Sequence, residues 1–129
     1  MKTCVSSYSF QPMLSSGEIT QLQLIGKVKE MGFDGIEFID LLPESGMSVE
    51  DYAKRLRDES EKTGLPIVNY TIGAELLNRP LDEECERLFK QVDIAEILAT
   101  MQQAAIMRPL ALTAGLSRLC PPSLRAAAE

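Results

Sequence analysis

Strand-like and helix-like segments alternate at a regular spacing over the first 98 residues, and this alternation restricts the fold more than any other feature. Residues 2–10, 34–39 and 66–72 are rich in β-branched, aromatic or other apolar residues and predict three short strands. Helical patterns lie between them and after the third. Such repeats predict βαβ units with a parallel sheet. Two α/β architectures fit, an open doubly wound sheet and a (β/α) barrel.

Residues typical of helix ends mark the three predicted helices. Ser15 followed by Glu18 has the spacing of a capping box, and Gly32 suits the left-handed position after the first helix. Ser48 and Gly64 bracket the second helix in the same way. Pro80 and the acids that follow it predict the start of the third, whose apolar stripe runs to position 98. The acidic runs DESEK and LDEECE are expected on the solvated faces of these helices.

The composition excludes several functional classes. With 129 residues the chain has the size of one domain, and its formal net charge of -6 gives no basic surface for nucleic acid or anionic lipid. No apolar run approaches the roughly 20 residues that span a bilayer, and the start of the sequence is too polar for a secretory signal. We therefore expect a cytoplasmic protein with no membrane and no nucleic-acid partner.

The sequence contains no histidine, and its three cysteines form no CxxC pair. A nucleophile activated by histidine is therefore excluded within this chain, as is a zinc ribbon. The sequence also lacks the glycine-rich patterns GxxxxGK[ST] and GxGxxG that hold phosphates.

Residues 99–129 differ in composition from the rest of the chain. Residues 1–98 carry 18 acidic and 10 basic residues, whereas 99–129 carry three arginines, one acid and no aromatic residue. The stretch AAIMRPLAL predicts a fourth strand, although its proline restricts it to an edge. We interpret 99–129 as an atypical, poorly ordered Ala/Leu/Pro/Arg tail. Our hypothesis is that it arose by a frameshift or another alteration of the terminus.

The segments KEMGFDGIEF, SVEDYAKRLRDESEKTGLPIVNY and DEECERLFKQVDIAEILA resemble the sugar phosphate isomerase/epimerase family, which has a xylose-isomerase-like barrel. The resemblance covers roughly residues 2–98, or about three of the eight βα units of such a barrel. It implies a partial (β/α) TIM-type barrel with an active site at the carboxyl ends of the strands. It also implies a metal-assisted isomerase or epimerase that acts on a small sugar or sugar phosphate.

The same resemblance implies a divalent metal, Mn, Mg or Zn, whose ligands come largely from later strands of the barrel. The predicted chain therefore has no complete metal site, and we expect it to be truncated and inactive alone. The alternative is a non-catalytic α/β fragment, or a half-barrel that forms homo-oligomers through its exposed sheet edges. A flavodoxin-like open binding module is a further alternative.

Three residues are predicted to line a sugar pocket. Glu37 is flanked by Ile36 and Phe38, so alternation along the strand points it away from the apolar face and toward a barrel interior. Tyr70 lies at the matching end of the third predicted strand, and Tyr8 near the end of the first. In the family an acid at this position would accept hydrogen bonds from sugar hydroxyls, and aromatic side chains suit a sugar face. No residue is assigned as catalytic or as a metal ligand.

Overall fold

The computed structural model describes residues 1–75 and 78–98, and these contain a three-stranded parallel sheet. Its strands are β1 (Cys4–Ser6), β2 (Gly35–Ile39) and β3 (Ile67–Thr71), arranged in the order β1-β2-β3. The prediction of three parallel strands is confirmed. The flavodoxin-like alternative is wrong, because that fold places β1 between β2 and β3, whereas β2 is the central strand here.

The first strand is shorter than predicted. β1 ends at Ser6, and the chain continues as the 3₁₀ helix η1 (Ser7–Phe10) and the short helix α1 (Gln11–Ser15). The Ser6 hydroxyl accepts a hydrogen bond from the Tyr8 amide, and the Ser7 hydroxyl accepts one from the Ile39 amide. The local bond at Ser6 favours a turn over an extended strand, whereas the bond at Ser7 joins η1 to the end of β2.

The first long helix begins five residues later than predicted. Helix α2 spans Gln21–Glu30, and its capping box consists of Thr20 and Gln23. Ser15 instead ends α1, and Gly17 turns the chain between the two helices with a φ of +74°. The predicted end of α2 is confirmed, because Gly32 has a left-handed φ of +85°.

The remaining helices agree with the sequence pattern. Helix α3 (Val49–Thr63) begins at an N-cap formed by Ser48 and ends at Gly64, which has a left-handed φ of +65°. Helix α4 (Leu81–Leu98) follows Pro80 directly. Helix α3 therefore starts and ends where its serine cap and its glycine predict, and α4 starts where its proline predicts.

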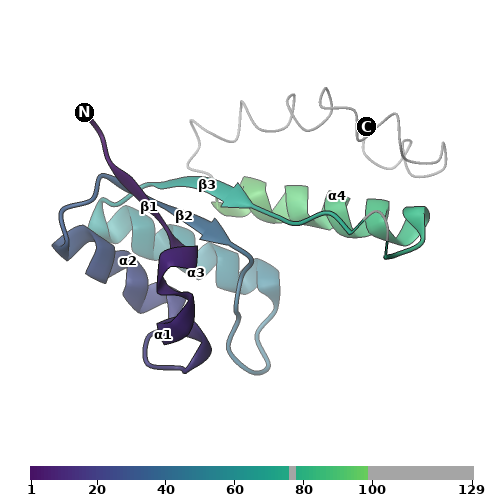
Figure 1. Cartoon of the computed structure of the whole chain (residues 1–129), viewed down its shortest axis with the longest axis horizontal. Coiled ribbons are helices and arrows are strands. Elements are labelled where there is room, and N and C mark those ends of the chain that lie inside the picture. The colour runs from purple at the N-terminus through teal and green to yellow at the C-terminus, as the bar shows by residue number, and fades with distance from the viewer. Residues whose placement is uncertain (76–77, 99–129) are drawn as a thin grey trace.

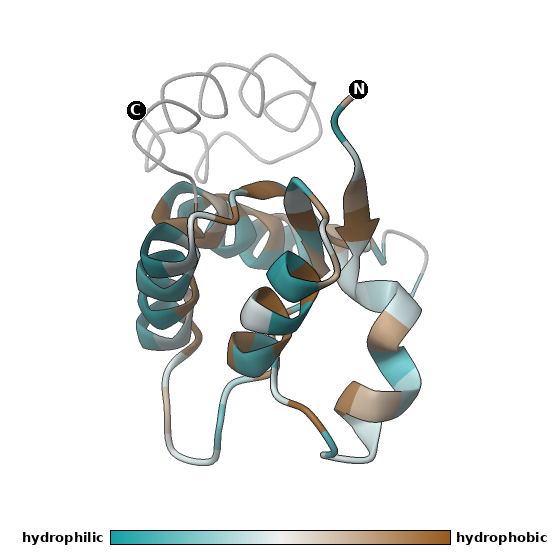
Figure 2. Cartoon of the chain, turned by 90° about the vertical axis from the view of Figure 1, so that its left-hand side faces the viewer, coloured by the Kyte–Doolittle hydropathy of each residue, from teal (hydrophilic) through white to brown (hydrophobic). Residues whose placement is uncertain are grey.

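All three long helices pack on one face of the sheet. The shared core comes from α2, α3, α4 and the facing strand residues: Leu24, Ile25, Val28, Ile36, Phe38, Tyr52, Ala53, Leu56, Leu65, Ile67, Ile94 and Leu98. Figure 1 shows the strands as one layer with α2 and α3 beneath it. Hydrophilic and hydrophobic residues lie on different sides of the helices in Figure 2. The opposite face of the sheet is not covered by these helices, and we call it the open face.

One irregularity in the sheet decides which residues reach the open face. The register pairs Ile36 with Ile67 and then Glu37 with Asn69, so β3 has an extra residue, Val68, at this point. Such a β-bulge reverses the direction of the side chains that follow it. Gly35 lies under the bulge, where a β-carbon would come within 2.6 Å of the Val68 side chain.

The described residues form a partial βα fold with helices on a single face. A (β/α) barrel winds its helices in this way, and the predicted barrel remains a proposal. Among the described residues, no helix is long and apolar enough to cross a bilayer. The predictions for the tail and its fourth strand concern 99–129 and lie outside the described residues.

Candidate functional site

Polar side chains from all three strands gather around Glu37 on the open face. Ile36 and Phe38 are fully buried against the helices, whereas Glu37 is partly exposed between them on the other side. The register places Ser6 of β1 on one side of Glu37 and Asn69 of β3 on the other. We call Ser6, Glu37, Asn69 and Thr71 the strand-end cluster. Ser6 and Thr71 are the last residues of their strands, so the cluster lies toward the carboxyl edge of the sheet.

Hydrogen bonds join the members of the strand-end cluster directly. The Thr71 hydroxyl donates to Glu37 Oε1 over 2.6 Å, and Asn69 Nδ2 donates to the same oxygen over 2.7 Å. Asn69 Nδ2 also donates to Thr71 Oγ1 over 3.0 Å. The carboxylate is therefore held by donors from the neighbouring strand, and its orientation is fixed by the sheet.

These donors favour the ionised form of Glu37. The Thr71 bond, then the Asn69 bond and to a smaller extent Ser6, lower the pKa of the Glu37 carboxyl below its ordinary value. Hydrogen bonds to the charged form have this effect because they stabilise the carboxylate relative to the neutral acid. A carboxyl with a lowered pKa is a weak base and is not protonated at neutral pH. It is suited to accepting hydrogen bonds from a ligand.

Tyr70 lies on the other face of the sheet from Glu37. It pairs with Phe38 in the register, packs against the core and donates its hydroxyl hydrogen to Gln91 Oε1 of α4 over 2.6 Å. Burial, with the nearby charge of Asp40, raises the pKa of Tyr70 to about 12. The structure therefore does not bring Tyr70 together with Glu37, and the tyrosine hydroxyl serves the packing of α4.

Tyr8 is the third residue predicted to line the pocket. It lies in η1, directly beyond the end of β1, and its side chain is 68% exposed. Its amide is tied to Ser6 of the strand-end cluster. The ring therefore lies at the carboxyl end of β1. Among the hydrogen bonds of the described residues, none joins the Tyr8 hydroxyl to the cluster.

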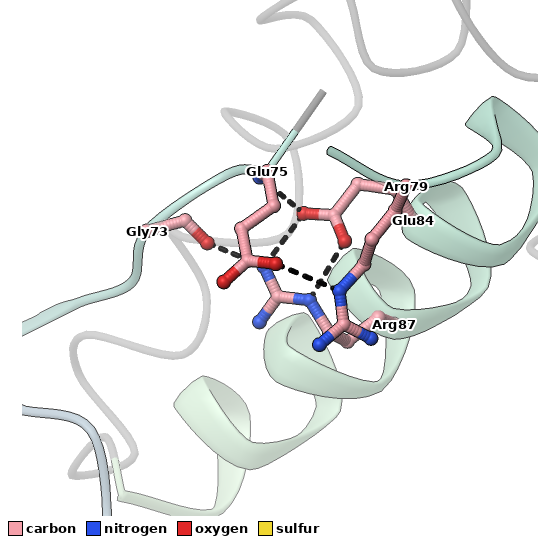
Figure 3. A network of polar contacts seen from close by, with 5 residues as sticks. All are labelled: Gly73, Glu75, Arg79, Glu84 and Arg87. Atoms are coloured by element: carbon pink, nitrogen blue, oxygen red, sulfur yellow. Dashed lines mark hydrogen bonds and ion pairs between the residues drawn. The ribbon is translucent and has the colours of Figure 1, made fainter. Parts of the chain in front are cut away.

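A second polar network, which the sequence analysis missed, holds the loop after β3 (Figure 3). Glu84 in the first turns of α4 has no exposed surface, contrary to the prediction that its acidic run is solvated. It accepts two bonds from Arg87, at 2.6 and 2.9 Å, and one from the Glu75 amide at 2.7 Å. Arg87 also donates to the Gly73 carbonyl. Arg79 pairs with the Glu75 carboxylate.

This network fixes a loop next to the strand-end cluster. The hydrogen bonds from Arg87 have the largest effect on the pKa of Glu84, and the bond from the Glu75 amide has the next largest. Together they lower this pKa to about 2. Gly73 and Glu75 follow Thr71 within four residues, so the network sets the path of the chain as it leaves the cluster. Two sequence signals identify this pair. Glu84 and Arg87 have the i,i+3 spacing of neighbours on a helix, and Glu84 lies four residues before the buried Leu88.

The strand-end cluster does not fit the divalent metal that the family resemblance implies. It supplies one carboxylate, and its amide and hydroxyl groups donate hydrogen bonds to that carboxylate, so they do not present a set of oxygen ligands. Within residues 1–75 and 78–98, no three His, Cys, Asp or Glu side chains are grouped to hold a metal ion. We derive no chemical step through a metal.

An open groove on another part of the surface lies between α1 and α2. Met13, Ile19, Leu22 and Gly26 form its apolar floor, and its charged lining residues are Glu18, Lys27, Glu30 and Glu59. These residues come from α1, the turn before α2, α2 and α3, and none of them is a strand residue. The groove is therefore separate from the strand-end cluster and lacks a comparable set of joined polar groups.

Comparison with known proteins gives no further assignment: the sequence matches no model of a known protein family, and no curated protein matches it either.

Proposed function

We propose that the chain binds a small sugar or sugar phosphate at the strand-end cluster, as the N-terminal part of a xylose-isomerase-like barrel. The observation that supports this function is the fixed, ionised Glu37 on the open face, near the carboxyl edge of a parallel sheet. Parallel α/β folds bind their ligands at this edge. A carboxylate flanked by an amide and hydroxyls is typical of sites that orient sugar hydroxyls.

The geometry favours binding over proton transfer at Glu37. Its lowered pKa makes it a poor general base, since catalytic bases usually have a pKa near the working pH. In the proposed isomerase or epimerase, Glu37 therefore orients the substrate and another group moves the proton. The described chain alone is proposed to bind a sugar without converting it.

Isothermal titration calorimetry on the 129-residue chain tests this proposal. A panel of five- and six-carbon sugars and sugar phosphates is titrated into the native chain and into Glu37→Ala, with and without Mn²⁺. Saturable binding that Glu37→Ala abolishes supports the site. Binding that is equal in both proteins places the sugar elsewhere, and no binding in the native chain refutes the proposal.

Self-association through sheet edges is a second proposal. In the described sheet, β1 and β3 each have one hydrogen-bonded neighbour. Cys4 on β1 is exposed and Val68 on β3 is 40% exposed. Unpaired strand edges are templates for pairing with another chain. Sedimentation equilibrium that shows a dimer supports this non-catalytic role, and a monomer at all concentrations contradicts it.

A further inference from the structure

The hydrogen-bond donors of the strand-end cluster are used within the cluster. Asn69 has two side-chain N–H groups, and Nδ2 donates to both Glu37 Oε1 and Thr71 Oγ1. The single hydroxyl hydrogen of Thr71 goes to Glu37. Ser6 lies beside Glu37 in the register, and its hydroxyl makes a smaller contribution to the lowered pKa of the Glu37 carboxyl. Asn69 and Thr71 therefore give their hydrogens to partners inside the cluster.

The orientation of the Asn69 amide follows from the charge of Glu37. An amide turned by 180° would point its oxygen at the carboxylate oxygen 2.7 Å away, where two acceptors repel each other. It would also leave Thr71 Oγ1 without its donor. The network has one consistent arrangement, in which Nδ2 faces Glu37.

The groups that remain for a ligand are hydrogen-bond acceptors. They are the other lone pairs of the Glu37 carboxylate, the side-chain carbonyl of Asn69 and the hydroxyl oxygens. The two arginines of the network after β3 already have acidic partners, because Arg87 pairs with Glu84 and Arg79 pairs with Glu75. A ligand at this surface must therefore supply the hydrogens.

From this arrangement we infer that the strand-end cluster binds the hydroxyl groups of an uncharged polyol and rejects phosphate. Sugar hydroxyls donate readily to a carboxylate, and bonds to charged groups are the stronger ones. Phosphate carries close to two negative charges at neutral pH and mainly accepts hydrogen bonds, so it is repelled by Glu37. The inference rests on the proposed function and narrows it: the phosphate of a sugar phosphate would lie away from the cluster.

Calorimetry with matched probes tests the inference. The probes are D-xylose, D-fructose, D-fructose 6-phosphate and inorganic phosphate, each titrated into the native chain, Glu37→Gln and the control Glu61→Gln on the exposed side of α3. We expect Glu37→Gln to weaken the binding of the neutral sugar about ten-fold or more. Glu61→Gln is expected to bind the neutral sugar as the native chain does. Inorganic phosphate is expected to bind none of the three proteins.

Substitutions at Thr71 provide a second test that does not alter the charge. Thr71→Ser keeps the donor to Glu37 and is expected to bind the sugar more tightly than Thr71→Val does. Thr71→Val removes the donor at nearly the same volume and is expected to weaken sugar binding. Urea midpoints of each variant show that it is folded under the conditions of the titration.

The outcomes separate the inference from the proposed function. If sugars bind the native chain but inorganic phosphate competes with them there, the inference is wrong while sugar binding stands. Equal affinity of the neutral sugar for the native chain and Glu37→Gln overturns the inference in the same way. If neither sugars nor sugar phosphates bind the native chain, both proposals are overturned.

Discussion

Replacing Gly35 by alanine tests the packing of the three strands that carry the site. An added β-carbon would lie 2.6 Å from Val68 Cγ1, 3.0 Å from Cys4 Sγ and 3.3 Å from the Pro66 carbonyl oxygen. The first distance is far inside normal contact. Because Val68 is β-branched, its side chain has few alternative rotamers with which to move away. The substitution therefore forces the strands apart or strains Val68.

The expected cost follows from two opposing effects. Overpacking costs about 1–3 kcal/mol, and alanine recovers about 0.5–1 kcal/mol relative to glycine in a strand. We expect Gly35→Ala to lower the free energy of unfolding by about 1–2 kcal/mol. With a urea m-value of about 1–2 kcal/mol/M, the midpoint falls by roughly 0.5–2 M.

Urea unfolding followed by far-UV circular dichroism measures this shift. Gly26→Ala is the matched control: nothing lies within 4 Å of its added β-carbon in α2, so it should raise stability by about 0.5–1 kcal/mol. In the double variant Gly35→Ala/Val68→Ala most of the Gly35→Ala cost should disappear, which is a coupling of about 1 kcal/mol. If Gly35→Ala is as stable as the native chain, or if Val68→Ala gives no relief, the bulged register is wrong.

Other substitutions test separate parts of the fold. Thr20→Ala should cost about 1 kcal/mol in urea unfolding, whereas Ser15→Ala should change stability by less than about 0.5 kcal/mol; equal effects would contradict the observed start of α2. Phe38→Ala should cost about 3–5 kcal/mol in the same assay, because its side chain is fully buried in the core, and a cost below about 1 kcal/mol would refute that position. The pKa of Glu84 lies at about 2 in the folded chain and near 4.5 when unperturbed, so the stability that this carboxylate contributes is present above pH 4.5 and is lost as the pH falls toward 2. Glu84→Gln should therefore flatten the dependence of the urea midpoint on pH between 2 and 5, and an unchanged slope would show that Glu84 is not held by Arg87.

Much of the fold could be predicted from local patterns. The three strands, Ser48 and Gly64 at the ends of α3, and Pro80 before α4 all follow from residues whose chemistry specifies one local structure. The start of α2 could not be predicted, because Ser15 with Glu18 and Thr20 with Gln23 offer two capping boxes within a few residues. The left-handed turn at Gly17 selects the second.

Which residues make up the candidate site depends on the β-bulge in β3, which the hydrophobic pattern of the sequence does not reveal. The position of Glu37 on the open face follows from simple alternation. Alternation from the buried Ile67 would also place Tyr70 on that face, but the extra residue Val68 reverses the direction. The bulge therefore brings Asn69 to Glu37 and turns Tyr70 toward α4. The burial of Glu84 was missed because its acidic neighbours are exposed.

The most direct test of the account is where on the chain a sugar binds. Backbone and side-chain NMR resonances of the native chain would be recorded during titration with the sugar that binds best in calorimetry. The account predicts that the largest shifts occur at Glu37, Thr71 and the Asn69 side-chain amide, and that in Glu37→Gln about ten-fold more sugar or higher is needed to shift Thr71 and Asn69. Shifts concentrated on the groove between α1 and α2, with the strand-end cluster unchanged, would contradict it.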